Sequence, residues 1–277
     1  DKDRIYFILY ADINLNIADG SSVWFASMAS MLSNIGKTVV VLKEPIYTQV
    51  ILSNITQTEN IIFLSSESFD SLPRTINVDL AARIISSLDK YLPSVQYLVL
   101  RGLQAAVQNS ITRQFSGRSV IYLTDFYRVE TDGLVVTDEQ ACKVAQVAAQ
   151  SRCFLAQTSR IGDYVAALAK RPVDIYRMPP PIPDDLGSFE PRTISAPVKI
   201  GYAGKINPDW GISELLDWTE KLRKQGFDVD LFIVANKISD GGVPGFRDAI
   251  IARMNELGVK FYNDFNREQS ITLMNDM

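Results

Sequence analysis

Gly204 and Lys205 are the residues of this sequence whose types and spacing are most suited to chemistry. They follow an apolar run, residues 198–202, and precede a short loop that ends at Gly211. A glycine lets a ligand approach the backbone closely, and a lysine adds a mobile cation. If a helix starts at Gly211, its unpaired N–H groups and its dipole favour an anion at the same place. The pattern predicts a phosphate-binding turn; the alternative is an ordinary strand-to-helix loop with a solvated lysine.

The elements around this turn are predicted to be a strand, a helix and a second strand between residues 198 and 235. Beyond Gly211, apolar residues recur at three- and four-residue spacing up to Gly226, which is typical of one buried helix face. Residues 229–234 then form a second apolar run. In such a unit the first strand delivers its carboxyl end to the start of the helix, so Lys205 is expected beside the anion site.

The stretch IGYAGKINPDWGISELL resembles the opening of the second domain of GT-B glycosyltransferases of family 4. In that family a strand ends in Gly-Arg or Gly-Lys, and a short loop, a Lys-Gly pair and a helix with a Leu-Leu pair follow. Gly204, Lys205 and Gly211 fit this pattern, whereas Trp210 stands where the family has its second basic residue. The resemblance implies that Gly204, Lys205 and Gly211 bind the diphosphate of a nucleotide-sugar donor. Trp210 departs from the pattern, so a weaker or differently built donor site is expected there, in which the ring stacks on a base or a sugar.

The first half of the chain opens in a similar way. A strand is predicted over residues 5–10, and the polar loop after it ends in Asp19, Gly20 and Ser21, which are typical of a helix start. Many family members carry a double glycine in this loop, and this chain has only Gly20. The resemblance implies that Asp19, Gly20 and Ser21 contact the acceptor or the donor; the alternative is a simple helix cap.

Two more predicted strands end in residues that can take part in chemistry. Residues 95–100 lead into Arg101, which is expected to meet an acidic acceptor or a phosphate, or else to form a surface salt bridge. Residues 119–123 lead into Asp125, which stands where family members commonly place a His-Asp pair near the reacting sugar. The resemblance therefore implies a catalytic Asp125, which orients an acceptor hydroxyl or takes its proton. The alternative is an aspartate that caps the following turn.

Composition excludes several classes of function. The 277 residues are 47% hydrophobic and 22% charged, enough for a sizeable core, and the net charge of −4 argues against nucleic acid as the main partner. No run of about 18 apolar residues predicts a transmembrane segment, and peripheral membrane contact stays open. Cys142 and Cys153 are the only cysteines and form no disulfide framework, so a cytoplasmic location is expected.

The chain has no histidine, which excludes a Ser-His-Asp triad and any zinc site that needs imidazole. Asp228-Val-Asp230 has the form of the metal signature of the other large glycosyltransferase fold. It lies at the beginning of a predicted strand, however, where alternating charges are more often exposed side chains. We therefore expect no metal and no cofactor, with a UDP- or GDP-hexose as substrate.

Strands and helices alternate throughout, which predicts an α/β fold with two Rossmann-like parallel-sheet domains. The expected boundaries are 1–178 for an acceptor-side domain, 179–197 for a proline-rich linker and 198–277 for part of a donor domain. Ligands of open α/β sheets bind beyond the carboxyl ends of the strands. In the GT-B arrangement, two sheets present these edges to one cleft.

The resemblance implies a glycosyltransferase that moves a hexose from a nucleotide sugar to a carbohydrate or lipid-linked acceptor, without a metal and with retained configuration. The alternative is a non-catalytic GT-B-like binding or assembly module of a larger protein. The chain begins at Asp1 without a methionine and ends inside a predicted helix, so it is expected to be a fragment. The glutamates with which family 4 enzymes hold the donor lie further along, so the fragment is expected to lack full activity alone.

Overall fold

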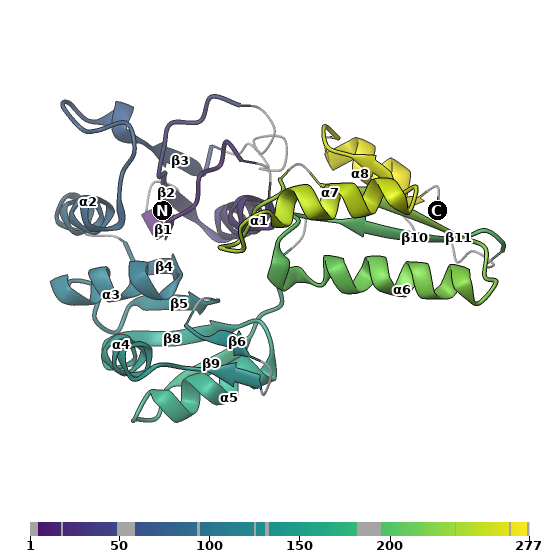
Figure 1. The fold of residues 1–277 in the computed structure, drawn as a ribbon. Coiled ribbons are helices and arrows are strands. Elements are labelled where there is room, and N and C mark those ends of the chain that lie inside the picture. The colour runs from purple at the N-terminus through teal and green to yellow at the C-terminus, as the bar shows by residue number, and fades with distance from the viewer. Residues whose placement is uncertain are drawn as a thin grey trace. The chain divides into compact units, whose positions relative to one another are not determined.

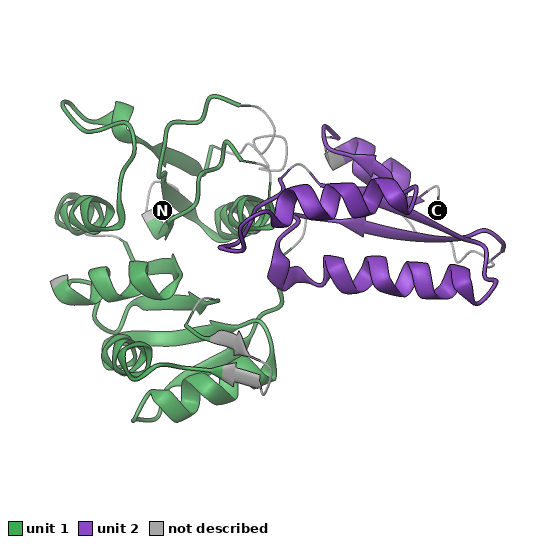
Figure 2. Ribbon diagram, viewed as in Figure 1, with its two compact units in different colours: residues 1–183 green, residues 184–277 purple. Residues whose placement is uncertain are grey.

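The computed structural model describes residues 5–17, 19–48, 59–92, 95–124, 126–130, 133–181, 195–235, 237–265, 267–275 and 277. The chain divides into two compact units, residues 1–183 and 184–277 (Figure 2). Each unit has its own parallel sheet, of seven strands in the first and three in the second. The predicted fold class, α/β with two Rossmann-like parallel sheets, is confirmed.

The sheet of the first unit has the strand order β3-β2-β1-β4-β5-β8-β9, and every neighbouring pair is parallel (Figure 1). The strands are β1 (Ile5–Ala11), β2 (Lys37–Val41), β3 (Ile61–Leu64), β4 (Tyr97–Arg101), β5 (Ser119–Leu123), β8 (Ser151–Ala156) and β9 (Asp174–Arg177). The strand order changes direction between β1 and β4, which is where open α/β sheets bind ligands.

Helices cover both faces of this sheet (Figure 1). They are α1 (Gly20–Ile35), α2 (Val78–Tyr91), α3 (Leu103–Thr112), α4 (Asp138–Ala148) and α5 (Ser159–Leu168). Because side chains alternate along a strand, Leu9 belongs to the buried cluster on the face of α1. Tyr10 belongs to the cluster on the other face, which also contains residues of α2, α3, α4 and α5. A short 3-10 helix, η2 (Ser66–Ser68), follows β3.

A small antiparallel hairpin of β6 (Arg128–Glu130) and β7 (Gly133–Val135) stands apart from the main sheet of the first unit. This hairpin is not predicted from the sequence. Strands of three residues are too short to show the alternation of apolar and polar positions on which strand prediction depends.

The second unit contains the predicted strand, helix and strand as β10 (Val198–Ala203), α6 (Ile212–Lys224) and β11 (Val229–Val234). The 3-10 helix η4 (Pro208–Trp210) lies between β10 and α6, and α7 (Phe246–Glu256), β12 (Lys260–Tyr262) and α8 (Arg267–Asn275) complete the unit. The strand order is β10-β11-β12, all parallel. Buried residues of α6, β11 and α7, such as Leu216, Ile233 and Met254, form its core.

Candidate functional site

The loop after β10 holds Lys205 at the carboxyl edge of the second sheet. The backbone N–H of Gly204 donates to the carbonyl of Val234 on β11, with the two atoms 3.0 Å apart. The Tyr202 hydroxyl donates to the carbonyl of Lys205, and the fully buried Ile206 anchors the next residue in the core. These contacts fix the backbone of Lys205 at the place where the phosphate-binding turn was predicted. The residue itself is half-buried.

Helix α6 begins directly after this loop, and no side chain of the described residues caps its amino end. The residue at the cap position is Gly211, with φ 72° and ψ 14°, a left-handed conformation that favours glycine. The first N–H groups of the helix therefore have no capping side chain, and they lie at the positive end of the helix dipole. One acidic residue, Glu214, lies in the first turn. The uncapped N–H groups favour an anion at this end of α6, and the Glu214 carboxylate opposes one.

A second lysine, Lys237, which is not predicted from the sequence, joins Lys205 at this edge. The N–H of Ile206 donates to the carbonyl of Lys237 at 2.9 Å, and the N–H of Ser239 returns a bond to the carbonyl of Ile206 at 2.9 Å. These bonds hold the exposed Lys237 beside the loop of Lys205. The sequence signal for Lys237 is its position soon after β11, because the carboxyl ends of neighbouring parallel strands meet at one edge of a sheet.

Trp210 brings an aromatic ring and no charge to the same loop. It is the last residue of η4, and its N–H donates to the carbonyl of Asn207 at 3.0 Å. Just over half of its surface, 53%, is exposed. The indole is available for stacking on a flat group, and the positive charge at this edge comes from the two lysines.

In the first unit, Asp19 acts as a helix cap. Its carboxylate accepts hydrogen bonds from the N–H groups of Ser21 and Ser22, at 2.8 and 2.9 Å, and so satisfies the start of α1. Gly20 is exposed, and a side chain there would meet nothing within 4 Å. This geometry favours the cap alternative for Asp19, while a ligand contact of Gly20 stays a prediction.

Arg101 and Ser21 lie together although they are far apart in the sequence. A guanidinium nitrogen of Arg101 donates to the Ser21 hydroxyl at 3.2 Å, and the guanidinium carbon lies 5.0 Å from the centre of the Trp24 ring. Arg101 ends β4 and Ser21 lies in the first turn of α1, so both sit at the carboxyl edge of the first sheet. The fold thus brings two of the predicted contact residues into one corner.

Two buried polar atoms lie in the same corner. The rings of Trp24 and Tyr122 have centres 4.7 Å apart, and neither the indole Nε1 nor the phenol oxygen forms a hydrogen bond of normal geometry. Burial raises the pKa of Tyr122, although nearby Gln157, Trp24 and Arg101 oppose the increase. Together with Arg101, these groups are hydrogen-bond donors suited to hydroxyl or carbonyl oxygens.

The predicted catalytic residue, Asp125, lies outside the described residues, and its role stays a prediction. Within the described ranges, no group of three or more cysteine, aspartate or glutamate side chains is arranged to hold a metal ion. The same part of the chain contains no helix long and apolar enough to cross a bilayer. Metal independence and cytoplasmic location therefore remain expectations.

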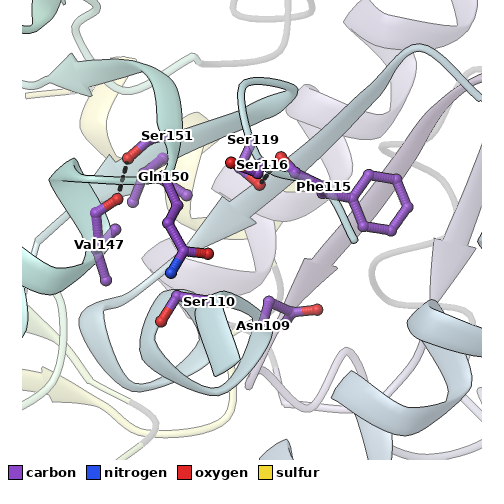
Figure 3. Close-up of a pocket in the computed structure, with 9 residues that line it drawn as sticks. Asn109, Ser110, Phe115, Ser116, Ser119, Val147, Gln150 and Ser151 are labelled. Carbon is purple, nitrogen blue, oxygen red and sulfur yellow. Dashed lines mark hydrogen bonds between the residues drawn. The ribbon is translucent and has the colours of Figure 1, made fainter. Parts of the chain in front are cut away.

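A small polar pocket lies away from these residues (Figure 3). Ser119 and Ser151, the first residues of β5 and β8, place it at the amino edge of the first sheet. Figure 3 shows Gln150 pointing toward Ser110 across this space. The serine hydroxyls are already used: Ser119 donates to the carbonyl of Phe115 and Ser151 to that of Val147. We do not assign this pocket to the candidate site.

No family model and no curated protein sequence matches the chain. Solved structures do match it over nearly its whole length. A sucrose-phosphate synthase from Thermosynechococcus elongatus has a TM-score of 0.69 at 12% identity, over 99% of this chain and 73% of its own. TarM has a TM-score of 0.64 at 9% identity, and the match covers 99% of this chain and 79% of TarM. An E. coli trehalose-6-phosphate structure bound with UDP-2-fluoro glucose has a TM-score of 0.59 at 12% identity. The match covers 98% of this chain and 76% of the E. coli chain.

The chain has a GT-B-like fold. At such low identity the likeness concerns the fold alone, because one fold supports many functions. Membership of family 4 stays a prediction from the resemblance around Gly204. What the chain binds has to be argued from its own site residues.

Proposed function

We propose that the chain is part of a glycosyltransferase that moves a hexose from a UDP- or GDP-sugar to a carbohydrate or lipid-linked acceptor, with retention and without a metal. The GT-B-like fold supports the class of enzyme, and one matching E. coli structure is bound with UDP-2-fluoro glucose. In the proposed reaction, the bond between the sugar and the diphosphate breaks, the acceptor oxygen bonds to the sugar, and the nucleoside diphosphate leaves. The acceptor loses its hydroxyl proton, which Asp125 is proposed to take.

The observation that carries this proposal is the uncapped start of α6, which follows the loop that begins with Gly204 and Lys205. A leaving diphosphate there would face backbone N–H groups on one side and the ammonium groups of Lys205 and Lys237 on another. Fixed donors aimed at developing negative charge are a major source of rate enhancement, and they replace the metal in this mechanism. Trp210 is proposed to stack on the base or the sugar.

The first test is nucleotide binding by Lys205→Ala. A charge-assisted contact contributes about 1.5–3 kcal/mol, so UDP or GDP should bind roughly ten- to a hundredfold more weakly. Lys237→Ala is expected to weaken binding in the same direction. Calorimetric titration of UDP and GDP measures the affinity of the parent and of both lysine variants. The titration is repeated with EDTA, and the affinity of the parent should not change.

Lys224→Ala is the matched control, because Lys224 is an exposed lysine at the opposite end of α6. It should bind nucleotides like the parent and unfold at a similar temperature. If Lys205→Ala binds as tightly as the parent, the phosphate-binding turn is refuted. Binding that disappears with EDTA refutes metal independence.

The second candidate is a non-catalytic GT-B-like module. Exposed Trp210 favours it, because the family pattern has a cation at that position. Such a binding or assembly module does not require a nucleoside diphosphate, so a parent chain that binds neither UDP nor GDP in the same titration would favour it.

A further inference from the structure

Tyr202 is a residue of β10 whose hydroxyl is bonded to the loop of the candidate site. Its ring packs against the core of the second unit, and the residue is half-buried. The hydroxyl donates to the carbonyl of Lys205, three residues further along the chain. Burial raises the pKa of Tyr202, so the hydroxyl keeps its proton near neutral pH and remains the donor of this bond. A side chain of the strand therefore closes the turn that follows the strand.

The peptide group between Lys205 and Ile206 is held on both sides. Its carbonyl accepts from Tyr202, and its N–H donates to the carbonyl of Lys237 at 2.9 Å. The peptide is trans, so its carbonyl and its N–H point in opposite directions. The peptide plane is therefore fixed between Tyr202 on one side and Lys237 on the other. We call these two hydrogen bonds the Tyr202 clamp.

The Tyr202 clamp joins the two lysines of the candidate site. The clamped peptide plane contains the α-carbon of Lys205, and its N–H is bonded to the backbone of Lys237 itself. A parallel bridge between Ile206 and Ile238 extends the same connection by one residue. Because like charges repel, two lysines whose backbones are joined in this way gain from a negatively charged partner.

We propose that Tyr202 is a positioning residue for the diphosphate of the donor. Its hydroxyl holds the backbone of Lys205 beside that of Lys237, so that both ammonium groups meet one diphosphate. Without the hydroxyl, the Lys205 carbonyl is released and can turn its negative partial charge toward the anion. A loop that is fixed before binding also loses less freedom when the ligand arrives.

Tyr202 acts through Lys205 and does not itself bind the diphosphate, because its hydroxyl proton is given to the Lys205 carbonyl and its ring packs in the core. The fixing of the loop by the clamp is independent of the proposed function. The diphosphate as the ligand rests on the proposed function.

The first experiment compares nucleotide binding by Tyr202→Phe, which removes the hydroxyl and keeps the ring. UDP and GDP, titrated calorimetrically, should bind about three- to tenfold more weakly, as expected for the loss of one hydrogen bond. In the Lys205→Ala background the same substitution should cost clearly less, because the ammonium that the hydroxyl positions is absent. A merely structural effect of Tyr202 would be equal in both backgrounds.

The second experiment measures hydrogen exchange of single amides by NMR without nucleotide. The N–H groups of Ile206 and Ser239 should exchange roughly threefold faster or more in Tyr202→Phe, while the core of α7 stays unchanged. Tyr262→Phe is the matched control, because Tyr262 is the half-buried tyrosine at the end of β12. Among the described residues its hydroxyl has no hydrogen bond, so this variant should change neither exchange nor nucleotide affinity.

Two results overturn the positioning role: parent-like nucleotide affinity of Tyr202→Phe, or an equal loss with and without Lys205. Unchanged exchange of the Ile206 amide in Tyr202→Phe refutes the clamp. A parent chain that binds neither UDP nor GDP refutes the proposed function together with the diphosphate as ligand, and faster exchange in Tyr202→Phe then still supports the clamp. Nucleotide binding by the parent that ignores Tyr202 refutes the positioning role alone.

Discussion

At the scale of single residues, the starts of α1 and α6 differ by one side chain. The Asp19 carboxylate occupies the start of α1, so an anion there would be repelled and would compete for the same N–H groups. Gly211 has no side chain, which leaves the start of α6 to another partner. This difference is the reason why we propose a diphosphate at the start of α6 and not at the start of α1.

Tyr122 carries a prediction at this scale, because burial raises the pKa of its hydroxyl. The native state then holds the phenolic proton more tightly than the unfolded chain does. Its contribution to stability is complete below the unfolded value of about 10 and is lost as the pH rises above it. Tyr122→Phe should therefore lose less stability than the parent between pH 8 and pH 10.5, as measured by urea unfolding.

At pH 7.5, Tyr122→Phe should lie within about 1 kcal/mol of the parent, because the hydroxyl has no hydrogen bond of normal geometry and loses only weak contacts with Gln157 and Trp24. A loss above about 2 kcal/mol at that pH would contradict the unbonded hydroxyl. The same variant shows whether the hydroxyl contacts a ligand, because weaker acceptor binding with unchanged stability would assign it that role.

At the scale of elements, two loops of the second unit position the candidate site together. The loop after β10 is bonded to the loop after β11 through Ile206, and the two pack where Gly241 meets Pro208. A side chain at Gly241 would lie 2.7 Å from the Pro208 ring, which is too close. The candidate site therefore depends on the contact between Pro208, which precedes α6, and Gly241, which follows β11.

Gly241→Ala should move these loops apart. The positive φ of 54° and the contact with Pro208 together should destabilise the second unit by about 1–3 kcal/mol and weaken UDP or GDP binding. Gly242→Ala is the matched control, because Gly242 also has a positive φ, 86°, but a side chain there would meet nothing within 4 Å. Equal effects of the two variants in denaturation and calorimetry would show that the contact does not matter.

At the scale of the whole molecule, each unit has its own hydrophobic core. The buried clusters of the first unit surround its seven-stranded sheet, and the cluster of the second unit contains residues from Ile206 onward. The described core of each unit therefore does not depend on side chains of the other. We expect the two units to unfold as separate cooperative parts.

Leu216→Ala tests this expectation, because Leu216 is 1% exposed in the core of the second unit. Removing a buried leucine side chain typically costs about 2–5 kcal/mol. Hydrogen exchange measured by mass spectrometry should show faster exchange in β10, β11 and α6 only. Ile85→Ala, at a fully buried position of α2, should produce the reverse pattern. Faster exchange in both units of either variant would contradict separate unfolding.

The sequence by itself determined the alternation of strands and helices, because apolar spacing and local turn residues record which elements can bury a face. It determined the turn at Gly204 and the start of α6 for the same reason, since both depend on neighbouring residues in the chain. Only the tertiary structure decided that Lys237 lies beside Lys205 and that Arg101 meets Ser21. These contacts depend on the order of strands in a sheet, which hydrogen bonds between distant segments set and local spacing does not encode.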